Sequence, residues 1–137
     1  MMPAPISVVR VILQDSNGGI LFLKRKNAKN ANNMWCLPGG RKGDESFEEA
    51  VRRETKEETN LDLSKIQYLF DYPIPAIIGQ TDKSSICSVF RASYSGDIRL
   101  NEEHSEYSWI YPRNIVKYPI AFHHNRIIER FLITLFK

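Results

Sequence analysis

Apolar residues in most of the chain fall into short runs separated by polar turns. Residues 6–13 are rich in β-branched side chains and predict a strand, and a second apolar run follows at 20–26. The segment between them, Asp15–Gly19, holds residues that tolerate positive φ, so we predict a β-hairpin. Residues 71–83 contain two prolines, which predict a loop rather than a central strand. Three further strands are predicted at 66–70, 84–94 and 107–111.

Two other segments repeat their apolar residues at helical spacing. In the first, at about 46–59, Phe47, Ala50 and Val51 form an apolar stripe along one side. The second covers roughly 120–136 and has the pattern of an amphipathic helix packed on a core. Strands mixed with two helices predict a layered domain of the α/β (α+β) class.

Composition and charge narrow the class of protein. The length of 137 residues suffices for one domain over 1–137, and 42% hydrophobic with 26% charged residues is typical of a globular protein. A net charge of +3 is too small to predict a nucleic-acid or membrane surface, and it mildly favours an anionic ligand. The first ten residues lack the charged and apolar regions of a secretion signal, so we expect a cytoplasmic protein. Cys36 and Cys87 are predicted to be free, buried thiols.

The predicted helix at 46–59 carries carboxylates on the same side as its apolar stripe. At about 100° per residue, Glu54, Glu57 and Glu58 lie within roughly 60° of the direction of that stripe. The residues expected on the opposite, solvent-facing side are Glu48, Glu49, Arg52, Lys56 and Thr59. Three carboxylates turned toward the core would repel one another and lose hydration, so they need a cation. Clustered carboxylate oxygens suit Mg²⁺ or Mn²⁺.

The alternative for this helix is an ordinary solvated surface with ion pairs between residues four apart. That interpretation fits Glu48 with Arg52 and Glu49 with Arg53, and it fails for the three carboxylates on the apolar side. The glycine pair at 39–40, just before the helix, can bring bare backbone close to a ligand, although a tight loop accounts for it as well.

The segment from Gly39 to Leu61 resembles the Nudix box of the Nudix (MutT-like) hydrolases. That box consists of Gly, five residues, Glu, seven residues, Arg-Glu, an aliphatic residue, any residue, Glu-Glu, any residue, Gly and an aliphatic residue. The charged positions that match it here are Glu45, Arg53, Glu54, Glu57 and Glu58. The likeness continues in "LKR", in the Trp before "LPGG" and in "EHSEYSWI", and so extends from the first strand to Trp109.

Three features depart from the box. Thr55 replaces the usual aliphatic residue, and its methyl group can still pack. Asn60 replaces the Gly that ends the helix, and Asn is the next most tolerant residue of the left-handed conformation required there. The loop from Gly40 to Glu45 is one residue shorter than in many members, with Asp44 in the place of a common Gly.

The resemblance implies a Nudix-like α/β/α sandwich, in which a mixed β-sheet is packed between helices. It implies a Mg²⁺-dependent hydrolase, with Mn²⁺ as a substitute, that cleaves the pyrophosphate bond of a nucleoside diphosphate linked to another group, X. Nucleoside triphosphates and nucleotide sugars are the first expected substrates, and a catalytically silent nucleotide-binding or sensor module on the same fold is the alternative. The implied partner is a small-molecule nucleotide, with no stable nucleic-acid partner and no membrane, and a homodimer is compatible with the resemblance.

Carried over residue by residue, the resemblance assigns the metal to the carboxylates on the apolar side of the helix. Glu54, Glu57 and Glu58 would hold Mg²⁺, and Gly39 or Gly40 would add a backbone carbonyl. The ion would neutralise the pyrophosphate charge and lower the pKa of an attacking water.

Other positions would support or complete the reaction. Glu45 would support the site from the start of the helix, and Arg53, one turn from Glu57, would orient it. The general base is a glutamate of the box or a residue of the later acidic loop. Glu103 lies six residues before the second Trp, the spacing at which similar proteins place an extra metal-binding or basic Glu, and His104 is a second candidate.

Two residues outside the box are candidates for substrate binding. Arg25 would meet a phosphate and Trp35 would stack on a base, with a surface charge and core packing as the respective alternatives. His123 and His124 are expected on the surface of the C-terminal helix.

Overall fold

The computed structural model describes residues 4–136, and two β-sheets form its centre. One sheet has the strand order β4-β1-β6-β5, and the other has the order β3-β2-β7. The strands are β1 (Ile6–Ile12), β2 (Ile20–Arg25), β3 (Trp35–Cys36), β4 (Gly39–Arg41), β5 (Asp62–Ile74), β6 (Ser85–Ser95) and β7 (His104–Ile110). The helices are α1 (Phe47–Thr59), the 3-10 helix η1 (Pro112–Lys117) and α2 (His124–Thr134). The larger sheet is mixed, because β1 runs parallel to β6 and antiparallel to β4.

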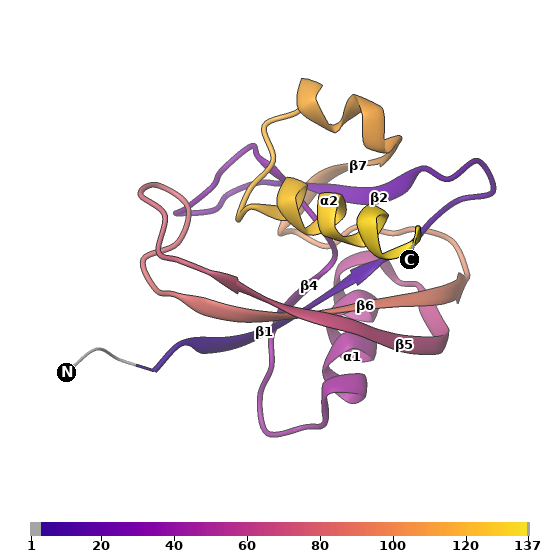
Figure 1. The fold of residues 1–137 in the computed structure, drawn as a ribbon, viewed down its shortest axis with the longest axis horizontal. Coiled ribbons are helices and arrows are strands. Elements are labelled where there is room, and N and C mark those ends of the chain that lie inside the picture. Colours follow the sequence, from indigo (N-terminus) through magenta and orange to yellow (C-terminus); the bar gives the residue numbers. More distant parts are fainter. Residues whose placement is uncertain (1–3, 137) are drawn as a thin grey trace.

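The helices α1 and α2 lie on opposite faces of the sheets (Figure 1). Apolar side chains of α1 pack with one set of strand residues, which includes Val9, Val11 and Leu21. Side chains of α2 pack with alternate residues of the same strands, such as Ile12 and Phe22. Because successive residues of a strand point to opposite faces, β1 and β2 contribute to both cores. This layered arrangement confirms the predicted α+β class.

The helix predicted at 46–59 is confirmed, and side chains at both ends explain its limits. Ser46 is the N-cap, and its hydroxyl accepts the N–H of Glu49 while the Glu49 carboxylate accepts the N–H of Ser46. At the other end Asn60 adopts the left-handed conformation at φ 68°, and its N–H donates to the carbonyl of Lys56. The Asn that replaces the usual Gly therefore ends the helix as expected.

The β-hairpin predicted for the first two strands forms only next to its turn, where Gln14 and Ile20 make an antiparallel bridge. The turn itself forms, since the N–H of Asp15 donates to the carbonyl of Gly19 at 2.9 Å and the Asp15 carboxylate accepts the N–H of Gly19. The two strands then diverge into different sheets. The reason is that β1 lies between β4 and β6 while β2 lies between β3 and β7, so each strand has both edges occupied. The first four residues of β2 are all buried, which is typical of a strand covered on both faces.

Two strands are longer than the sequence predicts. The strand β5 extends through Pro73 to Ile74, so the loop predicted from residue 71 begins only after residue 74. The strand lies at the edge of its sheet, where the missing N–H of a proline is tolerated. The strand β7 begins at His104 rather than at residue 107.

The phase predicted for α1 needs three corrections. Glu57, predicted on the side that faces the core, is exposed. Phe47 is 44% exposed instead of packed on the sheet, and the Lys42 ammonium lies 4.9 Å from the centre of its ring. Thr59, expected toward solvent, is buried, and its hydroxyl donates to the carbonyl of Thr55. A polar side chain that bonds to its own helix can be buried, and residue type does not reveal this.

Both cysteines are free and buried, which confirms that prediction. No helix within residues 4–136 combines the length and the apolar character needed to cross a membrane.

Candidate active site

The three glutamates of α1 that were predicted to turn toward the core differ in exposure, and only Glu54 and Glu58 turn inward. Glu58 is 5% exposed, the side chain of Glu54 is 15% exposed, and that of Glu57 is 54% exposed. Nη1 of Arg53 lies 3.0 Å from Oε1 of Glu54 and 3.4 Å from Oε1 of Glu57, so these two carboxylates converge on one guanidinium. Burial raises the pKa of Glu54, and Arg53 opposes that shift.

Glu58 is the most deeply placed carboxylate of the three. Its Oε1 accepts the N–H of Gly39 at 2.8 Å. Burial raises the pKa of Glu58 to about 8, although the Arg10 guanidinium and the Gly39 N–H act in the opposite direction. The carboxylates of Glu54 and Glu103 raise it further. Like charges around a buried carboxyl make this a place where a cation would be bound favourably.

The two glycines before α1 are required by close approaches of the backbone. Gly39 has φ +141°, and a Cβ on it would lie 2.0 Å from the carbonyl oxygen of Val9. A Cβ on Gly40 would lie 2.5 Å from Oε2 of Glu54. Both values are far below a normal contact, so the bare backbone of β4 lies directly against β1 on one side and against the Glu54 carboxylate on the other.

Arg53 links the start of α1 to its carboxylates. Its Nη2 lies 3.0 Å from Oε1 of Glu45, while its Nη1 contacts Glu54 and Glu57. The N–H of Gly43 and the Arg53 guanidinium hold the pKa of Glu45 at about 2. Arg53 therefore contacts three glutamates of the box, and not Glu57 alone as the sequence suggested.

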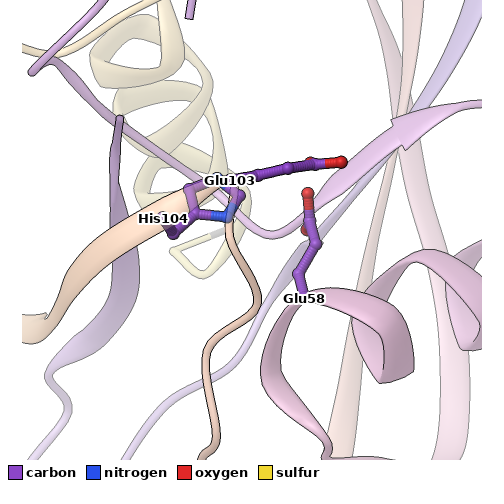
Figure 2. Close-up of side chains that lie close together, drawn as sticks. All are labelled: Glu58, Glu103 and His104. Atoms are coloured by element: carbon purple, nitrogen blue, oxygen red, sulfur yellow. The ribbon is translucent and has the colours of Figure 1, made fainter. Parts of the chain in front are cut away.

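The loop before β7 brings a second acidic residue to the same place. One ligand atom each of Glu58, Glu103 and His104 lies within 4.8 Å of the others. Figure 2 shows the Glu58 carboxylate extending from α1 toward that of Glu103, with the His104 ring beside them. His104 is 2% exposed, and burial lowers its pKa to about 4, with Arg25 and Arg10 acting in the same direction.

A cavity of about 470 Å³ opens beside this cluster. Its cationic lining residues are Arg10, Arg25, Lys26, Lys29 and Arg41. Glu103 also lines it, and Phe122 contributes an aromatic ring. Because its charged lining residues are mostly cationic, the cavity favours an anionic ligand.

Arg10 is a residue of this cavity that sequence reasoning missed. It is only 9% exposed, and its Nη1 donates to the carbonyls of Leu37 at 2.9 Å and Gly39 at 3.1 Å. The Gly39 carbonyl named above as a candidate metal ligand thus already accepts this bond. The signal was a single Arg inside the β-branched run "SVVRVIL", because a charge in a central strand requires partners.

Two aromatic positions lie elsewhere than expected. Trp35 packs in the apolar core with its ring edge-on to Tyr118 at 5.5 Å, which favours the core-packing alternative. His124 is buried, not on the surface, and its Nδ1 accepts the N–H of Leu37 at 3.0 Å. Arg25 does line the cavity, with its guanidinium 5.0 Å from the centre of the Phe122 ring.

His124 leads to a prediction about stability and pH. Burial, followed by Arg10 and Arg25, lowers the pKa of His124 well below its ordinary value of 6.5. Below about pH 6.5 the unfolded chain therefore binds a proton that the folded chain does not, and this contribution to stability is lost as the pH falls. We expect the free energy of unfolding of wild type to decrease from pH 7.5 to pH 5 relative to that of His124→Gln.

Denaturant unfolding of both proteins at several pH values measures this difference. The comparison with the variant is needed because the raised pKa of Glu58 contributes a change of opposite sign in both proteins. Parallel curves for the two proteins would contradict the assignment of a neutral, buried His124.

Comparison with known proteins identifies the family of this chain. The sequence matches the family model of the NUDIX domain over residues 4–131. It is 28% identical over 127 residues to Nudix hydrolase 19, chloroplastic, of Arabidopsis thaliana, a match that covers 92% of this chain and 28% of the plant protein. The chain thus spans less than a third of the length of that relative.

Solved structures with the same fold support the match. The MutT protein from Methanosarcina mazei Go1 is 28% identical with a TM-score of 0.80, and all of both chains is covered. The NUDIX domain of NrtR from Shewanella oneidensis, solved as a complex with ADP ribose, is 24% identical with a TM-score of 0.80, covering 98% of this chain and 90% of that one. The chain belongs to the NUDIX domain family, and its fold is the Nudix-like sandwich expected from the box.

Proposed function

We propose that this protein is a divalent-metal-dependent hydrolase that cleaves the pyrophosphate bond of a nucleoside diphosphate linked to a further group, with nucleoside triphosphates or nucleotide sugars as substrates. The observation that carries the proposal is that buried carboxylates and a cavity with cationic side chains lie next to each other. Glu103 lies close to the buried Glu58, and it also lines a cavity whose charged residues are otherwise all cationic. Carboxylates alone would repel a pyrophosphate, and a bound cation removes that repulsion.

The side chains present suit a hard divalent ion. Glu54, Glu57 and Glu58 offer carboxylate oxygens, the ligands that Mg²⁺ and Mn²⁺ prefer, and the substrate phosphates complete such sites. A bound ion would neutralise charge on the pyrophosphate and make a nearby water more acidic. Arg53 would keep Glu54 and Glu57 in position, and Glu45 would in turn position Arg53.

The cationic residues of the cavity would hold the phosphates. Arg25 and Arg10 reach the cavity from two neighbouring parts of the fold, and both guanidinium groups lie over the Phe122 ring, at 5.0 Å and 5.7 Å from its centre. This packing restricts the two side chains and so reduces the entropy lost on binding. A guanidinium can donate two parallel hydrogen bonds to a phosphate.

Glu103 would accept the proton of the attacking water. Glu103 lines the cavity and its carboxylate lies close to that of Glu58, which supports this role. We expect Glu103→Gln to lower turnover by roughly 10²-fold and to change the dependence of kcat on pH, because a general base typically contributes 10²–10⁴-fold. The measurement is a series of initial rates between pH 5 and pH 9.

The adjacent Glu102 provides a matched control for this variant. Glu102 is exposed and carries the same charge on the same loop. Glu102→Gln should leave the rate and its pH profile unchanged. An unaltered profile for Glu103→Gln would assign the proton transfer to a different residue.

The proposed reaction is tested by turnover of a panel of nucleoside triphosphates, nucleotide sugars and ADP-ribose with Mg²⁺ or Mn²⁺, with products identified by anion-exchange chromatography. The expected products are a nucleoside monophosphate and the second phosphorylated fragment. Binding of a nucleotide without any turnover would instead favour a silent binding module. Release of orthophosphate alone from a triphosphate would contradict cleavage at the inner pyrophosphate bond.

A further inference from the structure

The cluster of Glu58, Glu103 and His104 differs from an all-oxygen site in one respect, because one of its three members offers a nitrogen. The three residues come from two elements distant in sequence, the end of α1 and the start of β7. Their ligand atoms lie within 4.8 Å of one another. Two ligands opposite each other on an ion with bonds of about 2.1 Å are roughly 4.2 Å apart, so one ion bridges this spacing with small side-chain movements.

His104 has an unused hydrogen-bonding atom in this place. The residue is 2% exposed, and its Nε2 lies 3.9 Å from Sγ of the buried Cys36. Its Nδ1 is buried and finds no hydrogen-bond partner among residues 4–136. A buried polar atom without a partner is unfavourable, and a bound ligand would relieve that cost. Packing on the Cys36 side and pairing of β7 with β2 hold the ring where it is.

The type of ligand decides which ion is preferred. Mg²⁺ strongly prefers oxygen and dehydrates reluctantly, whereas an imidazole nitrogen suits transition ions such as Co²⁺ and Zn²⁺, and Mn²⁺ accepts both kinds of ligand. Two carboxylates with one imidazole therefore favour a first-row transition ion over Mg²⁺.

We propose that His104 supplies a nitrogen ligand to a divalent ion bound between Glu58 and Glu103, and that this site selects transition ions over Mg²⁺. The proposal rests on the proposed function, since the ion is the one that would serve hydrolysis. A carboxylate that contacts an ion through one oxygen keeps the other oxygen free, so Glu103 retains its proposed role toward water. Glu54 and Glu57 keep their roles as oxygen ligands.

Metal titrations of the full chain test the proposal without relying on activity. Calorimetric titration with Co²⁺ and with Mg²⁺ should give a dissociation constant for Co²⁺ that is lower by about 10-fold or more. His104→Gln should weaken Co²⁺ binding by at least roughly 10-fold. Mutation of a residue that only supports a metal ligand already lowers metal affinity by 10–100-fold, and loss of a ligand should cost no less. The variant should change Mg²⁺ binding much less, and the visible spectrum of bound Co²⁺ should change.

The half-exposed His123 provides a control histidine outside the cluster. His123→Asn, which keeps a residue tolerant of the φ of +57° at this position, should bind both ions as wild type does. An unchanged ratio of the Co²⁺ and Mg²⁺ constants in His104→Gln would overturn the proposal.

A measurement on the wild-type protein covers the case in which His104→Gln does not fold. Pulsed electron paramagnetic resonance of the protein with one equivalent of Mn²⁺ detects a nitrogen bound directly to the ion, and we expect the coupling of one imidazole nitrogen. A Mn²⁺ signal with no nitrogen coupling, in a protein that hydrolyses nucleotides, would refute the role of His104 and leave the proposed function intact. Absence of both metal binding and hydrolysis would refute the proposed function itself.

Discussion

Glu57→Gln is expected to lower the metal-dependent turnover of a nucleotide substrate by roughly 10²-fold or more, because a metal ligand provides several kcal/mol of stabilisation to the transition state. The folded structure should be retained. The Glu57 side chain is 54% exposed, and its contact with Arg53 at 3.4 Å is an exposed ion pair, which contributes less than about 1 kcal/mol. Initial rates and denaturant unfolding of the same preparation separate the two effects.

Glu48 is a closely matched control on the same helix. Its side chain is 59% exposed and pairs with Arg52 four residues later, just as Glu57 pairs with Arg53 four residues earlier. Glu48→Gln thus makes the same chemical change at a similar exposure, and we expect wild-type turnover. Equal losses in both variants would mean that the charge of the helix matters rather than a specific site. Full activity in Glu57→Gln would remove this residue from the metal site.

Gly39→Ala is expected to destabilise the fold by at least about 3 kcal/mol, because both steric clash and backbone strain act at this residue. The added Cβ would lie 2.0 Å from the backbone oxygen of Val9, which cannot move without breaking the pairing of β1 with β4. The φ of +141° is in addition poorly accessible to alanine. Denaturant unfolding measures the loss of stability. A stability within about 0.5 kcal/mol of wild type would contradict the close approach of Gly39 to the backbone of β1.

Gly40→Ala provides the contrast at the next residue. The three atoms nearest to its added Cβ all belong to the carboxylate of Glu54, the closest at 2.5 Å, and a flexible side chain can turn away. We expect near-normal stability, together with a loss of turnover of roughly 10²-fold, as follows from a displacement of about 1 Å in a catalytic site. The pair of variants therefore separates support of the fold from placement of Glu54. Full activity of Gly40→Ala would show that turnover does not depend on the exact position of the Glu54 carboxylate.

The sequence predicted the limits of α1 and the inward position of Glu54 and Glu58 because local rules decide them, whereas Glu57 is exposed against the prediction. The capping box at Ser46 and the left-handed Asn60 are read from residue type and spacing alone. The inward phase of Glu58 follows from the helical repeat, and it is the most buried of the three glutamates. The burial of Thr59 was not predicted from the helical repeat, because it depends on a hydrogen bond from its hydroxyl to the carbonyl of Thr55.

The remaining errors concern long-range pairing, which local patterns do not encode. The turn at Asp15–Gly19 is correct, and yet β1 and β2 separate because each is paired along both edges with other strands. The burial of His124 depends on the N–H of Leu37, 87 residues earlier. The convergence of Glu58 with Glu103 is likewise set by the packing of α1 against the sheets, and not by either segment alone.

The most direct test of the central claim is the thermal stability of wild type and of Glu54→Gln with and without Mn²⁺. An ion that binds only the folded protein stabilises it by about 2.7 kcal/mol at 100 times its dissociation constant, and a single domain of this size then unfolds several degrees higher. We predict this rise in Tm for wild type, its reversal by a chelator and a much smaller rise for Glu54→Gln. A Tm that does not respond to Mn²⁺ or Mg²⁺ would show that these carboxylates do not form a metal site.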